Sequence, residues 1–142
     1  MNETMRKFGY PATLVAEFEH WVVLLRPAQP TLGSLVLAAR SDATALSDLS
    51  AEAHAEMKLA STAIETALRS FVDYAKINYL MLMMVDPHVH AHVIPRYEGN
   101  RDFTGVQFPD AGWPKLPDLG SAVALDDAQV AELVAALKPH FG

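Results

Sequence analysis

The segment that most constrains the fold is residues 88–94, which read HVHAHVI and alternate histidine with an apolar residue. A period of two residues predicts a β-strand, because successive side chains of a strand point to opposite faces of its sheet. His88, His90 and His92 then form one row, with about 6.6 Å between neighbours along the strand. We therefore expect a sheet with one face against an apolar core and a row of imidazoles on the other.

The composition fits a single packed domain over residues 1–142. Apolar residues make up 51% of the chain and charged residues 20%, which is typical of a globular protein. No apolar run approaches the roughly 20 residues that cross a bilayer. The first ten residues, MNETMRKFGY, lack the apolar core of a signal peptide. The absence of cysteine excludes disulfides, thiolate nucleophiles and thiolate zinc sites. We therefore expect a cytoplasmic protein that does not act at a membrane.

The net charge indicates which kinds of molecule the protein can bind. Seventeen acidic and 11 basic side chains give a formal charge of −6, and no cluster of Lys and Arg occurs. Proteins that wrap nucleic acid need a basic face to neutralise phosphates. Polymeric nucleic acid is therefore not expected as a partner, whereas a small anionic ligand needs only local donors.

Strands are expected both before and after one long helix in the sequence. Apolar, β-type runs at residues 13–18, 20–26 and 31–40 predict the first strands. Ser50 is a suitable N-cap for the helix, in which apolar residues recur at three- and four-residue steps, namely Met57, Ala60, Ile64, Leu68 and Phe71. The run INYLMLMMV, residues 77–85, predicts a strand that is covered on both faces or pressed into a subunit interface.

The second half of the chain continues with a turn signal. Asp86-Pro87 favours a turn, so the apolar strand and the histidine strand are expected to form an antiparallel hairpin that Pro95 closes. Residues 98–124 are expected to form an irregular covering segment, since four glycines and three prolines lie between residues 98 and 120. A last helix, 126–141, begins with a capping box of Asp126 and Gln129.

The residues alone leave three interpretations of the histidine row open. In the first, the imidazoles lie on a solvated strand face. In the second they hold zinc, with Asp86 or His20 as a further ligand. In the third, one neutral imidazole attacks a phosphorus atom while its neighbours stabilise the phosphoryl oxygens. A row of three suits this last chemistry, because it offers a central attacker with a helper on each side.

Residues 88–94 match, position by position, the His-φ-His-φ-His-φ-φ pattern (φ, apolar) of the histidine triad (HIT) family, which the chain therefore resembles. Residues 94–96, IPR, continue as in the branch that contains the fragile-histidine-triad-like dinucleoside polyphosphate hydrolases. Upstream, LLRPAQPTLGSLVL, residues 24–37, is similar to the family's strand, Pro-rich turn, glycine and second strand. The resemblance covers residues 10–97, and the C-terminal third is only loosely alike.

This resemblance implies an α+β fold: a five-stranded antiparallel sheet with a long helix and a C-terminal helix, and a homodimer in which the two sheets adjoin. It also implies a nucleoside phosphate ligand and a covalent nucleotidyl-histidine intermediate. By position, His90 is the nucleophile, and His92 touches the scissile phosphate or the leaving group. His88 fixes the nucleophile's ring through its backbone carbonyl and supports the site with its side chain.

The chain departs from the family pattern at two places. The family usually has a histidine directly after the glycine of the second strand, where it buttresses the triad, and this chain has Ser34 there. We expect the Ser34 hydroxyl to reach His88, although it cannot share a proton as an imidazole would. In relatives a polar, glycine-containing loop precedes the triad, and here MMVDP, residues 83–87, takes its place.

Asp86, Arg96 or the 98–120 segment could supply the help to the leaving group that these departures remove, and a further charged residue, Arg26, is a candidate for the nucleoside pocket. Asp86 lies just before the triad, and Arg96 just after the strand. The Arg96 guanidinium suits phosphate oxygens, although a strand-end surface cation is the alternative interpretation. Arg26 follows the first long strand and is a candidate for lining the nucleoside pocket, although the favoured interpretation is a strand-end residue without a ligand role.

The sequence therefore predicts a nucleotide hydrolase or nucleotidyl transferase in which neutral His90 attacks the α-phosphorus of a nucleoside 5′-phosphate derivative. A polyphosphate leaves without strong acid help, so a dinucleoside polyphosphate is expected ahead of a phosphoramidate. No cofactor is required, although Mg²⁺ can accompany a polyphosphate. Two alternatives stay open: a nucleotide-binding HIT-like protein with little or no turnover, and a zinc enzyme with histidine ligands.

Overall fold

The computed structural model describes residues 1–142 and is built around a five-stranded antiparallel sheet. The strand order in the sheet is β1–β2–β4–β6–β5. The bounds are β1 Leu14–Glu17, β2 Trp21–Leu25, β4 Leu35–Ala39, β5 Lys76–Leu80 and β6 His90–Arg96. The expected α+β fold with a five-stranded antiparallel sheet is therefore confirmed.

The long helix and the C-terminal helix form where the capping signals predict them. Helix α2, Ala51–Val72, begins after Ser50, whose hydroxyl accepts a hydrogen bond from the backbone N–H of Ala53 at 3.1 Å. Helix α3, Asp127–Leu137, begins with the capping box of Asp126 and Gln129. Short 3₁₀ turns lie at Leu46–Asp48 and Lys138–Phe141. None of the helices combines the length and the apolar character that a membrane-spanning helix needs.

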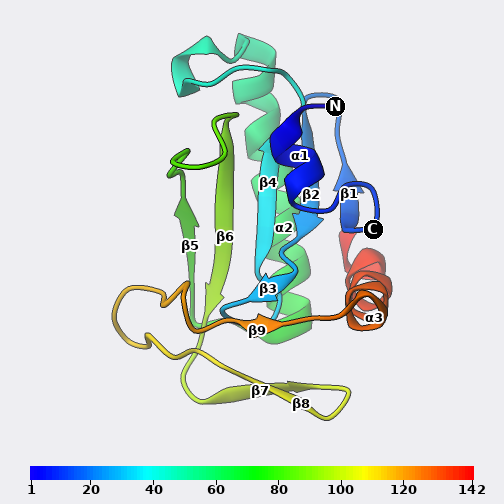
Figure 1. Ribbon diagram of the computed structural model, residues 1–142, viewed down its shortest axis with the longest axis vertical. Helices are drawn as coiled ribbons and strands as arrows, with labels where there is room; N and C mark the ends of the chain where they lie inside the picture. The colour runs from blue at the N-terminus through cyan, green and yellow to red at the C-terminus, as the bar shows by residue number, and fades with distance from the viewer.

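The two faces of the sheet are covered by different helices (Figure 1). Helix α2 runs behind the sheet in this view and belongs to an apolar core of 24 buried residues. The other face carries helix α1, Glu3–Lys7, which the sequence reasoning did not predict. Beneath α1 lies a separate cluster of five buried residues, Met5, Val22, Leu24, Val36 and Ala38. We call these two sides the helix face and the histidine face.

The apolar run 77–85 is not the buried strand that the sequence indicated. Strand β5 ends at Leu80, and it lies at the edge of the sheet with no fully buried residue. The residues that follow form a loop in which Leu82, Met84 and Val85 are exposed, Met84 to 84%. An apolar run reports hydrophobicity but not the position of a strand within its sheet, which is why the expectation of a strand covered on both faces was wrong. The other alternative, a strand pressed into a subunit interface, stays a prediction.

The histidine strand pairs with β5 in an antiparallel hairpin, as expected, but its bounds are shifted. Strand β6 begins at His90, so His88 precedes it, and Pro95 lies inside it. A proline fits there because the pairing of β4 with β6 extends only to Leu35 and Val93, so Pro95 pairs with β5 alone.

The covering segment is more regular than its composition indicated. Strands β7, Asn100–Phe103, and β8, Val106–Pro109, form a hairpin around Thr104 and Gly105, which both have positive φ angles. That geometry matches the twist of a two-residue hairpin. Further on, β9, Val123–Ala124, pairs with β3, Ala28–Gln29. The segment is thereby tied to the chain that follows β2.

Candidate active site

The sheet places two of the three predicted histidines on the histidine face. In the ladder between β4 and β6, His90 lies opposite Ala38 and His92 lies opposite Val36. Side chains directly opposite each other share a face, and both partners belong to the five-residue cluster beneath α1. Val89, Ala91 and Val93 point into the core on the helix face. The alternation in the sequence therefore separates core from site as predicted.

His90 is held in one tautomer by the backbone. Its Nδ1 lies 2.7 Å from the carbonyl oxygen of His88. Because a carbonyl only accepts, Nδ1 carries the proton in this bond, and in the neutral ring Nε2 is then the nitrogen with the lone pair. The residue is only 2% exposed. Its ring packs against the rings of His92 and Phe8, with centroid distances of 5.1 and 5.6 Å.

His92 is a neutral imidazole in this environment. Burial, the positive charge of Arg26 and the neighbouring His90 together lower the pKa of His92 to about 4, although the Asp86 carboxylate acts in the opposite direction. The residue is 8% exposed, and its Nδ1 is buried without a hydrogen-bond partner. His92 can therefore donate or accept a hydrogen bond at neutral pH, but it holds no proton to release as an imidazolium.

His88 and Asp86 are each tied to helix α1. His88 Nδ1 lies 2.9 Å from the hydroxyl oxygen of Thr4. Asp86 pairs with Lys7 across 3.4 Å. Together with the contact of Phe8 on two histidine rings, these bonds make the N-terminal residues a wall of the site. The sequence reasoning missed this wall, because no local pattern links residues 4–8 to residues 86–92.

Arg26 is the predicted cation whose charge can act on a ligand in the site. Its backbone N–H donates to the Ser34 carbonyl at 3.1 Å, which continues the ladder between β2 and β4. In the guanidinium group, one terminal nitrogen donates to the Ala28 carbonyl at 2.7 Å, whereas Nε is buried without a partner. Burial lowers the pKa of Arg26. The positive charge of Arg26 acts on His92 and favours an anion in this part of the site.

Ser34 does not reach the histidine row, contrary to the expectation from the sequence. Its side chain is fully buried, and its hydroxyl bonds only to Thr31: it donates to the Thr31 carbonyl at 2.8 Å and lies 2.9 Å from the Thr31 hydroxyl. The reason is local, because the Ser34 hydroxyl finds its hydrogen-bond partners within its own turn, residues 31–34. A substrate contact by Ser34 does not fit this arrangement.

Arg96 is likewise a structural residue and not an open phosphate ligand. It is 4% exposed, and its Nε and one terminal nitrogen bond both carboxylate oxygens of Asp110, at 2.7 and 3.1 Å. Further bonds run to the Asn78 side chain and the Lys115 carbonyl, each at 2.8 Å. Arg96 therefore anchors the covering segment to β5 and β6. The sequence could not reveal Asp110 as its partner.

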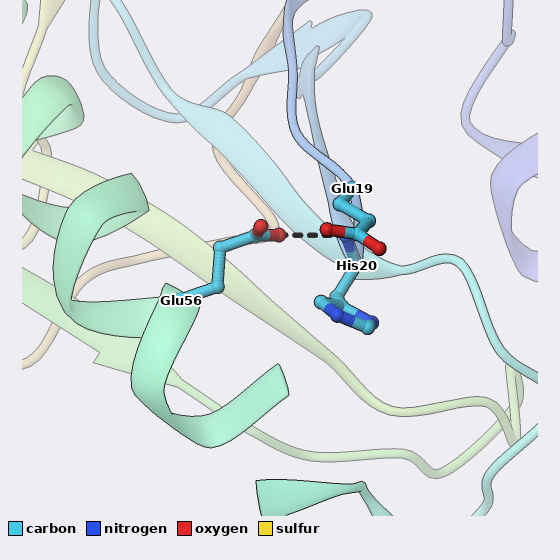
Figure 2. A group of neighbouring side chains, drawn as sticks. All are labelled: Glu19, His20 and Glu56. Carbon is cyan, nitrogen blue, oxygen red and sulfur yellow. Dashed lines mark hydrogen bonds between the residues drawn. The ribbon is translucent and has the colours of Figure 1, made fainter. Parts of the chain in front are cut away.

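The predicted metal-site partner His20 lies elsewhere in the molecule. One group of side chains could share a metal ion by distance, namely Glu19, His20 and Glu56 (Figure 2). Glu56 belongs to α2, and its carboxylate accepts a hydrogen bond from the His20 backbone N–H at 2.6 Å. The helix face holds this group, so His20 is not a further ligand for the histidine row.

Comparison with known proteins agrees with the fold and the motif. A profile of the HIT domain matches residues 7–99. Similar solved structures include a histidine triad protein from Bradyrhizobium japonicum, at 19% identity and TM-score 0.71 over 100% of this chain and 97% of that one. Another, from Marinobacter aquaeolei, has 22% identity and TM-score 0.70 over 99% and 94% of the chains.

A third solved structure, the diadenosine triphosphate hydrolase of Plasmodium falciparum, has 12% identity and TM-score 0.66 over 92% of this chain and 76% of that one. No curated protein matches the chain by sequence. At these identities the solved structures establish the fold alone, whereas the profile spans well over half of the chain and includes the three histidines. The chain belongs to the HIT family.

Proposed function

We propose that this protein is a nucleotide hydrolase or nucleotidyl transferase that uses His90 as its nucleophile. The observation that carries the proposal is the hydrogen bond from His90 Nδ1 to the His88 carbonyl, because it leaves the lone pair on Nε2. A neutral imidazole whose other nitrogen is bonded is an oriented nucleophile. Membership of the HIT family supports the same class of reaction.

The reaction proceeds in two steps. The Nε2 lone pair forms a bond to the α-phosphorus of a nucleoside 5′-phosphate derivative, and the bond from phosphorus to the bridging oxygen breaks, with its electron pair leaving on that oxygen. Water then attacks the phosphoramidate. The phosphorus–nitrogen bond breaks, the electron pair returns to Nε2, the water proton passes to solvent, and the nucleoside monophosphate is released.

His92 and Arg26 favour a leaving group that needs no proton. Because its pKa is about 4, His92 is not protonated at neutral pH and cannot act as a strong acid for an amine leaving group. A polyphosphate leaves as an anion, which the positive charge of Arg26 near His92 favours. We therefore favour a dinucleoside polyphosphate as substrate. Mg²⁺ would enter with the polyphosphate, and no step requires another cofactor.

A homodimer is part of this proposal. Strand β5 lies at the edge of the sheet, and the loop that follows it exposes the apolar residues Leu82, Met84 and Val85. Apolar residues beside an open strand edge are typical of an interface. Light scattering after gel filtration measures the mass, and a charged substitution such as Met84→Glu should convert a dimer to a monomer.

The test of the proposal is an assay of His90→Gly on a panel of dinucleoside polyphosphates and nucleoside phosphoramidates. We expect the variant to lose at least about 10³-fold in kcat/KM, because no nucleophile remains. The matched control is His54→Ala, which removes an exposed histidine of α2 and should leave turnover unchanged. Activity of His90→Gly at the wild-type level would exclude His90 as the nucleophile.

One observation favours a second function, nucleotide binding with little turnover. Ser34 is held in its own turn and His92 is not an acid at neutral pH, so few groups can assist a leaving group. Calorimetry on the same panel separates the two functions. Tight binding of a nucleoside monophosphate, with no product at high protein concentration, would support the binding protein.

A further inference from the structure

Helix α1 contributes a buried hydroxyl to the histidine row from the other end of the chain. Thr4 is 1% exposed, and its hydroxyl has a single hydrogen-bond partner, Nδ1 of His88 at 2.9 Å. The two residues are 84 positions apart in the sequence. A buried hydroxyl that faces a ring nitrogen favours one orientation of that ring, because turning the ring away leaves the buried hydroxyl without its partner.

The helix that carries Thr4 is itself fixed to the sheet. Asn2 caps α1 by accepting the Met5 backbone N–H at 2.9 Å, and its amide nitrogen donates to the carbonyls of Ala39 and Ser41, each at 2.9 Å. Met5 is buried in the five-residue cluster on the histidine face. Figure 1 shows α1 lying against the sheet beside β2 and β4. Thr4 therefore sits on a firmly docked element.

The His88 side chain depends on this contact, because the neighbouring backbone bond holds only the peptide: the His88 carbonyl shares a peptide unit with the Val89 N–H, which donates to the Ala43 carbonyl at 3.0 Å. The residue precedes β6, whereas Val89 is bonded on both sides, to Ala39 and Ala43, each at 3.0 Å. The carbonyl of His88 receives the proton of His90 Nδ1. A displaced His88 peptide would therefore release the His90 ring. Ser34 offers no substitute, since its hydroxyl is bonded to Thr31.

We propose that Thr4 is a positioning residue for the covalent step: its hydroxyl holds the His88 ring, and the His88 carbonyl in turn holds His90 with Nε2 free. This inference rests on the proposed function, and it assigns a role to α1 that the triad alone does not contain. Thr4 does not touch the reacting atoms. Its effect passes through two hydrogen bonds, one made by the side chain and one by the backbone of His88.

The test compares Thr4→Val with Thr4→Ser. Valine keeps the volume and removes the hydroxyl, whereas serine keeps the hydroxyl and removes a methyl group. We expect Thr4→Val to lower kcat by about 10- to 100-fold, as a small misplacement of a reacting group does. KM should stay close to the wild-type value, because Thr4 does not contact the substrate. Thr4→Ser should keep a kcat close to the wild-type value.

A second measurement does not depend on turnover. Nitrogen-15 NMR of the histidine rings reports which ring nitrogen carries the proton. In the wild-type protein and in Thr4→Ser, His90 should be protonated on Nδ1. In Thr4→Val, the His88 signals should shift and the His90 signals should move toward a mixture of tautomers. Thermal unfolding and the backbone amide spectrum show whether each variant is folded.

The outcomes separate this inference from the proposed function. If the wild-type protein turns over none of the substrates, the proposed function fails, and the NMR comparison alone decides the role of Thr4. A folded Thr4→Val with wild-type kcat, or with unchanged His90 tautomer, would overturn the inference. So would a Thr4→Ser variant as impaired as Thr4→Val, because the hydroxyl would then not be the group that matters.

Discussion

The two faces of the central sheet differ in what covers them. The helix face packs under the 22-residue helix α2 in an apolar core of 24 residues, and its strand residues are aliphatic or aromatic. The histidine face packs under a five-residue helix, with only five residues in its apolar cluster and two buried imidazoles beside them. One sheet thus carries a face that stabilises the fold and a face that holds reactive groups.

This difference has a physical basis in the alternation of side chains along each strand. Val89, Ala91 and Val93 hold β6 in the core, so the histidines between them need not contribute to packing. His90 is instead fixed by its hydrogen bond to the His88 carbonyl, and the rings of His90 and His92 both contact Phe8. We expect substitutions on the helix face to change stability, and those around the histidines to change chemistry.

The largest effect on stability should come from the far end of the histidine face, where Arg96 pairs with Asp110. Asp110→Ala leaves a buried guanidinium without its carboxylate, and we expect a loss of about 3–5 kcal/mol in the free energy of unfolding. Urea unfolding measures it. The control is Glu17→Ala, which breaks the exposed pair with Arg40 and should cost under about 1 kcal/mol. Equal losses would show that Arg96 is not a structural anchor.

The next effect is the pH dependence of stability that His92 causes. The folded protein protonates His92 only near pH 4, whereas the unfolded chain protonates it near its ordinary value of 6.5. Between these values the unfolded state binds more protons at His92, so the contribution of His92 to stability falls as the pH falls from about 6.5 to 4 and is constant above that range. The loss should reach up to about 3 kcal/mol.

Urea unfolding at pH 7.5 and at pH 5 measures this dependence in the wild-type protein and in His92→Asn, which has no group to titrate at that position. We expect the variant to lose less stability than the wild-type protein between the two pH values. The same loss in both proteins would mean that His92 is not buried in its neutral form, and that the histidine face is open to protons.

A smaller effect on stability is expected when the two faces are compared at two adjacent valines. Val22 and Val23 are both fully buried in β2, Val22 under α1 and Val23 in the large core. We expect Val23→Ala to cost about 2–3 kcal/mol and Val22→Ala about 1 kcal/mol, because a short helix can move to fill a cavity more easily than the large core can. Urea unfolding of both variants measures the difference. A larger cost for Val22 would reverse the comparison.

The smallest effects on stability concern the two N-caps. Asn2 caps α1 on the histidine face, and Ser50 caps α2 on the helix face. Loss of the cap should cost about 1 kcal/mol at either position, and Asn2→Ala also loses the hydrogen bonds to the Ala39 and Ser41 carbonyls. We expect only Asn2→Ala to lower turnover, because α1 carries Thr4 and Phe8 to the histidines. Thermal unfolding and a turnover assay measure both properties, and equal turnover in the two variants would mean that α1 does not support the site.

The sequence predicted the features that depend on neighbours along the chain. The alternation at residues 88–94 indicated both the strand and the side on which its histidines lie, and the capping residues Ser50 and Asp126 marked the starts of two helices. These signals are local, since one strand or one helix turn contains all the groups that they involve. They led to the sheet and to the histidine row.

The features that were missed depend on contacts between distant residues. The partners of Ser34 and Arg96 are set by the turn at 31–34 and by Asp110, and the wall formed by α1 depends on the bond from Thr4 to His88. The hairpin around Thr104 was missed because a non-glycine residue with positive φ has no clear sequence signal. Distance in sequence, more than any weakness of the motif, limited the prediction.

The most direct test of the account is to trap the covalent intermediate. Wild-type protein is mixed briefly with a dinucleoside polyphosphate, quenched under conditions that preserve phosphoramidates, digested and analysed by mass spectrometry. We expect a nucleoside monophosphate group on the peptide that contains His90, with fragmentation placing it on that residue, and no such group in His90→Gly. A nucleotidyl group on any other residue, or product formation by the His90→Gly variant at the wild-type rate, would contradict the central claim.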